Sequence, residues 1–140
     1  MLRIAILDLY EGKPNQGMRC IRQIINEWAE SHCVETSFDE FDVRQHKQVP
    51  DLTYDVYISS GGPGNPLATE GSEWEAEYFN WFEQVESWNN NPLNHNKKFV
   101  FLICHSFQLV CRHYGIGDIS KRKSTAFGVF PVHVTLDGQH

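Results

Sequence analysis

The sequence predicts an α/β protein with an open, mostly parallel sheet that carries helices on both faces. Short apolar runs of strand length alternate along the chain with longer segments of helical periodicity. The first apolar run continues without alternation, which is typical of a parallel strand buried on both faces. A glycine-rich loop and a cysteine each follow a predicted strand. Both are therefore expected at the edge of the sheet where open α/β proteins bind ligands.

Length and composition limit the classes of protein that need to be considered. The 140 residues fit a single domain, residues 1–140, and an apolar fraction of 41% is enough for a core. A formal net charge of -6 argues against nucleic acid as a general partner. The N-terminal apolar run is too short for a signal peptide or a membrane span, so we expect a cytoplasmic protein with no membrane association.

The first half of the chain is predicted to form a strand, a helix and two further strands. Residues 3–9 are the buried strand, and residues 10–17 form a loop with two glycines and a proline. Apolar residues at helical spacing predict a helix over residues 18–28. Residues 34–39 alternate between apolar and polar side chains, which predicts a half-exposed strand near a sheet edge. Residues 55–59 are apolar at their centre and predict another buried strand.

The glycine-rich loop and an aromatic helix come next. Residues 59–66 hold three glycines and two prolines, so their backbone can approach a ligand closely. Ser72 and Glu75 match a capping box and predict the start of a helix, which ends before Pro92. One face of this helix is apolar and mostly aromatic, and it consists of Trp74, Tyr78, Trp81, Phe82 and Val85.

The remaining segments give one strong strand–helix signal and two weaker strand signals. Residues 99–103 form an apolar run, and helical spacing begins directly after Cys104 with Phe107, Val110, Cys111 and Tyr114. Residues 119–123 predict a short strand, and residues 128–135 predict a strand near an edge because they contain a proline. Asp137-Gly138 is a hairpin-turn signal with only two residues after it, so we expect the chain to be the N-terminal part of a longer domain.

Cys104 is the candidate reactive residue. A buried strand that runs directly into a helix holds this cysteine at the carboxyl end of the sheet and at a helix N-terminus, the geometry of a nucleophile elbow. The partial positive charge of a helix N-terminus favours a thiolate over a thiol. The other three cysteines, Cys20, Cys33 and Cys111, show no Cys-x-x-Cys spacing and are interpreted as structural. No metal-ligand spacing and no nucleotide fingerprint is visible, so we expect no cofactor.

Three blocks of the sequence together resemble the class I (triad-type) glutamine amidotransferase family, in particular its members similar to the amidotransferase domain of GMP synthase. Residues 60–66, Ser-Gly-Gly-Pro-Gly-Asn-Pro, look like the family's oxyanion loop. Residues 104–108, Cys-His-Ser-Phe-Gln, line up with the Cys-x-Gly-x-Gln core of its nucleophile motif. Residues 114–132 match the segment that follows. The likeness covers essentially the whole chain and implies a flavodoxin-like, amidotransferase-like form of the predicted fold.

The resemblance implies a role for each matched residue. In this family a cysteine attacks the side-chain amide of glutamine, a thioester forms, and ammonia is released to a partner synthase. Carried over, Cys104 is the nucleophile, and the backbone N–H groups of Gly62 and His105 bind the oxyanion. The residues implied to line the substrate pocket are Gln108, Gly61, Pro63 and Gly64. Glutamine or a related amide is the implied substrate.

Two features depart from the family pattern. The family's base is a histidine oriented by a glutamate in a C-terminal His-x-Glu segment, and no His-x-Glu occurs in this sequence. A thiol without an activating base is a poor nucleophile at neutral pH, so we expect the 140-residue chain to be inactive by itself. Leu102 and Ser106 occupy positions where the family has glycine, and a leucine could crowd the tight turn.

Other interpretations of the same residues stay open. Cys104 could be a small buried apolar residue, and the glycines at 61–64 could form only a tight connection. The domain could be a non-catalytic binding or interaction module on the same scaffold, which Leu102 favours. It could also be a cysteine hydrolase of γ-glutamyl amides, which would use the same residues. If a missing C-terminal part normally covers the aromatic helix face, the present chain could expose it or form a homo-oligomer through it.

Overall fold

The protein is built on a four-stranded sheet whose strands are all parallel, in the order β2-β1-β3-β4. The structure is a computed structural model, and it describes residues 1–121, 123–124, 128–129 and 131–139. The strands are β1 (Leu2–Asp8), β2 (Thr36–Asp42), β3 (Val56–Ser59) and β4 (Phe99–Leu102). All four were predicted from the sequence, and β2 lies at an edge as expected.

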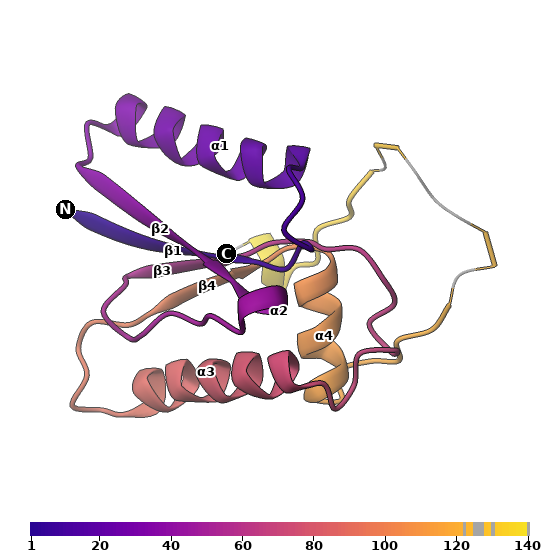
Figure 1. The fold of residues 1–140 in the computed structure, drawn as a ribbon. Helices are drawn as coiled ribbons and strands as arrows, with labels where there is room; N and C mark the ends of the chain where they lie inside the picture. The colour runs from indigo at the N-terminus through magenta and orange to yellow at the C-terminus, as the bar shows by residue number, and fades with distance from the viewer. Residues whose placement is uncertain (122, 125–127, 130, 140) are drawn as a thin grey trace.

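Helices cover both faces of this sheet, which confirms the predicted class (Figure 1). Helix α1 (Gln16–His32) lies on one face, called here the α1 face. Helices α2 (Val43–His46), α3 (Glu73–Asn90) and α4 (His105–His113) lie on the other, called here the α3 face. A short 3-10 helix, η1 (Asp137–Gln139), lies near the end of the chain.

The order of the strands reverses between β1 and β3. From β1 the chain crosses through α1 to β2 on one side, and from β3 it crosses through α3 to β4 on the other side. In open α/β sheets the crevice outside the carboxyl ends of two such strands is the usual ligand site. The segments after β1 and β3 therefore border the position at which a ligand is expected.

The α3 face holds a large aromatic core. Tyr57, Tyr78 and Trp81 are almost completely buried, and the ring centroids of Tyr57 and Trp81 lie 5.2 Å apart. Leu109 of α4 is completely buried in the same core. The aromatic stripe predicted on the helix at 74–85 is thus mainly core, with Tyr78, Trp81 and Val85 buried.

The α1 face holds a smaller, aliphatic core. Met18, Ile21 and Ile25 of α1 pack against Ile4 and Ile6 of β1. Asn15 caps the helix, because its side chain accepts the Met18 N–H at 2.8 Å. Two further residues of the predicted apolar stripe, Ile24 and Trp28, are exposed and border an apolar hollow of 260 Å³ over β1 and β3.

Two local predictions on the α3 face need correction. Ser72 is the N-cap of α3, but its hydroxyl makes no capping hydrogen bond. The reciprocal bond of a capping box is also missing, because the Ser72 N–H donates to the Thr69 carbonyl and the Glu75 carboxylate accepts from Thr69 and Arg112. The helix after Cys104 buries only part of the predicted face. Val110 and Cys111 are buried together with Leu109, whereas Phe107 is 56% exposed.

The two weaker strand predictions are wrong for the residues that the structure describes. Residues 119–121 and 123–124 are not in a strand, and neither are residues 128–129 and 131–135; the intervening positions lie outside the described part. The apolar side chains at 129, 132 and 136 are almost fully exposed and pair with no described strand. Alternation alone is therefore insufficient where no neighbouring strand lies within reach.

Candidate active site

The junction between β4 and α4 has the backbone of a strained elbow. Cys104 lies between the end of β4 at Leu102 and the start of α4 at His105, with φ 51° and ψ -98°. The two other described non-glycine residues with positive φ, Cys33 and Lys47, are ordinary left-handed caps at helix ends. Cys104 is exposed, which contradicts the alternative of a buried apolar cysteine. Strain of this kind in a non-glycine residue is characteristic of functional positions.

Ser106 holds the elbow against the neighbouring strand. Its hydroxyl is completely buried, donates to the backbone carbonyl of Ser59 at 2.9 Å and accepts the N–H of Ile103, also at 2.9 Å. A small side chain with a hydroxyl therefore suits this position, where the family pattern has glycine. Leu102 packs against the core of the α3 face, and the elbow forms with a leucine in this place.

The glycine-rich loop after β3 lies directly beside Cys104. A Cβ added at Gly61 would lie 3.7 Å from the Cβ of Cys104 and 3.8 Å from the Ile103 carbonyl oxygen. A Cβ added at Gly62 would lie 2.5 Å from the Leu9 carbonyl oxygen, so a larger residue there would collide with the end of β1. The structure thus brings Gly61 of the loop next to a cysteine that lies 43 positions later in the sequence.

His105 is held by a buried arginine rather than pointing to Cys104 as a base. Nη2 of Arg44 donates to Nε2 of His105 at 2.7 Å. Burial, and then the charges of Arg44 and Arg112, lower the pKa of His105 to about 4, so its ring is neutral at physiological pH. The His105 backbone N–H stands at the first position of α4 and donates to no described residue.

The remaining predicted pocket residues differ in how far they are buried. The N–H of Gln108 donates to the Cys104 carbonyl at 3.0 Å, and the Gln108 side chain is half-buried. Pro63 and Gly64 are exposed at the tip of the loop. A Cβ added at Gly64, where φ is +98°, would lie 4.0 Å from Nη1 of Arg44.

Sequence reasoning missed two arginines that support this loop. Arg44 lies on α2, a four-residue helix that no periodicity signals, with its side chain only 8% exposed and its guanidinium 5.0 Å from the centroid of a Trp74 ring. Arg112 of α4 donates to the carbonyl of Pro66 and pairs with Glu75. Burial lowers the pKa of Arg44 as well. No pattern in the sequence around either arginine indicates which loop its side chain contacts.

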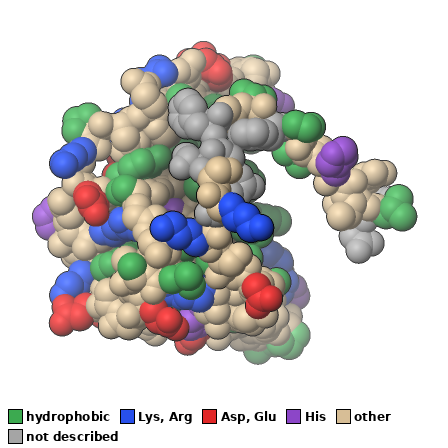
Figure 2. Space-filling view, turned by 90° about the vertical axis from the view of Figure 1, so that its right-hand side faces the viewer, with side chains coloured by type: hydrophobic (Ala, Val, Ile, Leu, Met, Phe, Trp, Pro, Cys, Tyr) green, Lys and Arg blue, Asp and Glu red, His purple; other side chains and the backbone are tan. Residues whose placement is uncertain are grey.

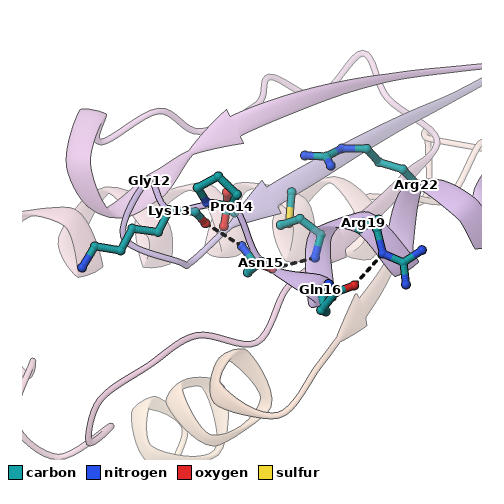
Figure 3. A pocket seen from close by; sticks show the side chains of 9 residues that line it. Gly12, Lys13, Pro14, Asn15, Gln16, Arg19 and Arg22 are labelled. Atoms are coloured by element: carbon teal, nitrogen blue, oxygen red, sulfur yellow. Dashed lines mark hydrogen bonds between the residues drawn. The ribbon is translucent and has the colours of Figure 1, made fainter.

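A separate hollow lies between the loop after β1 and the first turns of α1 (Figure 3). Its volume is 650 Å³, and its charged lining residues are Asp8, Lys13, Arg19 and Arg22. Burial, together with the neighbouring Asp42 and Glu40 carboxylates, raises the pKa of Asp8. Cys104 does not line this hollow.

The described residues show neither a metal centre nor a membrane span. In the described ranges, no three His, Cys, Asp or Glu side chains gather closely enough to hold a metal ion. None of the described helices is both long and apolar enough to cross a bilayer. Figure 2 shows the side of the molecule toward which the strands run in Figure 1. Basic and acidic side chains are interspersed on this side.

Comparison with known proteins gives matches among solved structures only. No family model matches the sequence, and no curated protein matches it significantly. A glutamine amidotransferase from Thermotoga maritima is similar in structure, with a TM-score of 0.56 and 16% identity over 81% of this chain and 43% of that protein. A protein designated SMU.1228c gives a TM-score of 0.46 and 21% identity over 81% of this chain and 44% of its own.

The match to the Thermotoga maritima protein establishes the fold and no more. At 16% identity the likeness to the Thermotoga maritima protein shows a shared fold, which confirms the amidotransferase-like form of the predicted α/β class. The chain spans less than half the length of both matched proteins.

Proposed function

We propose that this chain is part of a class I glutamine amidotransferase domain in which Cys104 attacks the side-chain amide of glutamine. The observation that carries the proposal is the strained backbone of Cys104, an exposed thiol at the N-terminus of α4. The adjacent Gly61 and the amidotransferase-like fold support it. The three sequence blocks that resemble the family support it as well, and they are most similar to members like the amidotransferase domain of GMP synthase.

The proposed reaction is an acyl transfer in two steps. In the first, the Cys104 sulfur forms a bond to the amide carbon, the C–N bond breaks, and the thiol proton leaves with the nitrogen as ammonia. In the second, water cleaves the thioester, which releases glutamate and restores the thiol. The ammonia would pass to an acceptor on a partner synthase, and we place this chemistry in the cytoplasm.

The backbone around Cys104 is proposed to stabilise the negative charge on the amide oxygen. The N–H groups of Gly62 and His105 make no hydrogen bond with any described residue; Gly62 follows Gly61, which lies beside Cys104, and His105 follows Cys104 in the chain. Fixed backbone donors of this kind act strongly because they need no reorganisation as charge develops. Gln108 and the loop residues Gly61, Pro63 and Gly64 would then contact the glutamine.

The two histidines of α4 do not supply the base that the proposed mechanism needs. His105 is neutral and its Nε2 is occupied by Arg44, and the His113 ring stacks on Phe79, with ring centroids 3.9 Å apart. Neither ring is placed to take the proton of Cys104. This observation also favours the second candidate, a binding module that has the scaffold without turnover.

Covalent labelling of Cys104 tests the proposal. We expect a glutamine analogue with a chloroketone in place of the amide to add once, at Cys104, and free glutamine to slow the reaction. Intact-mass and peptide mass spectrometry measure both effects. Iodoacetamide, which lacks the glutamine backbone, should also modify Cys20 and Cys33, because these thiols are exposed.

Two variants control the labelling experiment. Cys104→Ser should abolish the adduct of the analogue, whereas Cys33→Ser should leave it unchanged. Equal labelling of Cys104, Cys20 and Cys33 by the analogue, without protection by glutamine, would contradict the amidotransferase proposal. That result would favour the binding module.

A further inference from the structure

Tyr10 is placed at the crevice between the carboxyl ends of β1 and β3. It follows β1 by two residues, and its backbone N–H donates to the Asp8 side chain at 2.8 Å, which turns the chain sharply at the end of the strand. Its ring packs against the aliphatic core of the α1 face. The strand order reverses at this crevice, so it is the expected ligand position in the fold.

Gly17 leaves the space that the phenol occupies, and Gly61 lies beside it. A Cβ added at Gly17, in the first turn of α1, would lie 2.4 Å from the Tyr10 hydroxyl oxygen and 3.1 Å from the ring carbon that carries it. A Cβ added at Gly61 would lie 3.6 Å from the same oxygen. The hydroxyl therefore lies between the start of α1 and the loop after β3, and at Gly17 a side chain would displace it.

Tyr10 and Cys104 both lie close to Gly61. A Cβ added at Gly61 would lie 3.6 Å from the Tyr10 hydroxyl oxygen and 3.7 Å from the Cβ of Cys104. Tyr10 and Cys104 thus border one small space, which they approach from β1 and β4 respectively.

The Tyr10 hydroxyl is available as a hydrogen-bond donor in this space. Burial, and then the neighbouring Cys104 and Asp8, raise its pKa, so the hydroxyl keeps its proton at physiological pH. Within the described part of the chain it makes no hydrogen bond. A partly buried hydroxyl without a partner is unfavourable unless water or a ligand satisfies it.

We propose that Tyr10 is a substrate-binding residue of the Cys104 site, whose hydroxyl donates a hydrogen bond to an oxygen of the bound amide. This assignment rests on the proposed function of Cys104. It adds a side-chain donor on the β1 side of the site to the backbone donors proposed at Gly62 and His105. None of the sequence blocks that resemble the amidotransferase family includes Tyr10.

The test compares Tyr10→Phe with the unaltered chain in the labelling reaction of Cys104. Loss of one hydrogen bond to the analogue should lower its second-order labelling rate roughly fivefold. The rate with iodoacetamide, which offers no glutamine backbone, should change less than twofold. Tyr54→Phe is the matched control, because it removes the hydroxyl of another mostly buried tyrosine, bonded to Asp39 at 2.9 Å, and should leave both rates unchanged.

Gly17→Ala provides a second variant that keeps the phenol and moves it. Alanine is favoured over glycine inside a helix, but its Cβ would also lie 3.2 Å from Oδ1 of Asn15, the N-cap of α1, so urea denaturation of this variant has to show that the fold keeps its stability. We expect this variant to slow labelling by the analogue, and to have a much smaller effect when Tyr10 is already phenylalanine.

The outcomes separate this inference from the proposed function. If Tyr10→Phe and Gly17→Ala label at the unaltered rate while Cys104 still prefers the analogue, Tyr10 has no role in binding and only this inference is wrong. If the unaltered chain shows no preference for the analogue at Cys104, the proposed function fails, and the role of Tyr10 fails with it.

Discussion

The two faces of the sheet differ in how completely they are covered. On the α3 face, Tyr57 and Trp81 are buried among helices from three segments of the chain. On the α1 face a single helix covers the strands, and Phe99 and Phe101 of β4 remain 65% and 63% exposed. The Cys104 elbow is anchored on the filled face through α4, whose Leu109 is completely buried there, while the preceding Ile103 packs on the α1 face. A site at the rim of a sheet can thus be rigid even where the opposite face is thinly covered.

Matched truncations on the two faces should show the largest difference in stability. Leu109→Ala removes a completely buried side chain from the α3 face and should lower the free energy of unfolding by about 3–5 kcal/mol. Ile25 borders the apolar hollow of the α1 face, where neighbouring side chains can relax. Ile25→Ala should therefore lower the free energy of unfolding by about 2 kcal/mol. Urea denaturation measures both. Equal losses would mean that the two faces stabilise the fold to the same extent.

The buried His105 should make the stability of the α3 face depend on pH. Its pKa in the folded protein is about 4, below the value near 6.5 of an exposed histidine. As the pH falls below 6.5 the unfolded chain takes up a proton that the folded chain does not, so stability is lost between about pH 6.5 and 4.

His105→Gln isolates this contribution. Glutamine keeps a side-chain acceptor for Arg44 and has no titratable group, so the variant should lose less stability over the same interval, by on the order of 2 kcal/mol. Thermal unfolding at pH 7, 6, 5 and 4 makes the comparison. Parallel curves for the variant and the unaltered protein would show that His105 is protonated in the folded state.

The smallest effect is expected on the exposed part of the α1 face. Phe101→Thr keeps a β-branched residue suited to a strand and should change the free energy of unfolding by less than about 0.5 kcal/mol. It should also reduce self-association, because exposed apolar side chains on an edge strand promote pairing between copies. Denaturation and light scattering at increasing concentration measure the two effects. A large loss of stability would mean that Phe101 is covered in solution.

Strands and long helices were predictable because each carries a strong local pattern. The continuous apolar run at β1 and the run from Phe99 into the helix after Cys104 fixed the class of fold and the position of the elbow. The loop at residues 60–66 was predictable as a close neighbour of a ligand because glycines leave backbone exposed. Its contact with Cys104 followed from the rule that parallel strands end at one edge.

The rest of the candidate site depends on contacts between distant segments. Arg44, on a helix of four residues, reaches His105 across 61 positions of sequence, and no periodicity marks either partner. The role inferred for Tyr10 depends on the missing side chains of Gly17 and Gly61, which become meaningful only when three segments meet. Alternating apolar residues near 128–135 gave a wrong strand prediction because strand formation also needs a partner.

The backbone conformation of Cys104 places a reactive thiol at a position where it lowers the stability of the fold. A φ of 51° with a ψ of -98° costs a non-glycine residue on the order of 1–3 kcal/mol, whereas glycine adopts positive φ with little penalty. Directed evolution for heat resistance alone would therefore tend to select glycine at 104 and eliminate the thiol. Any engineering of this scaffold needs a functional screen at that residue, because a stability screen alone would reward its loss.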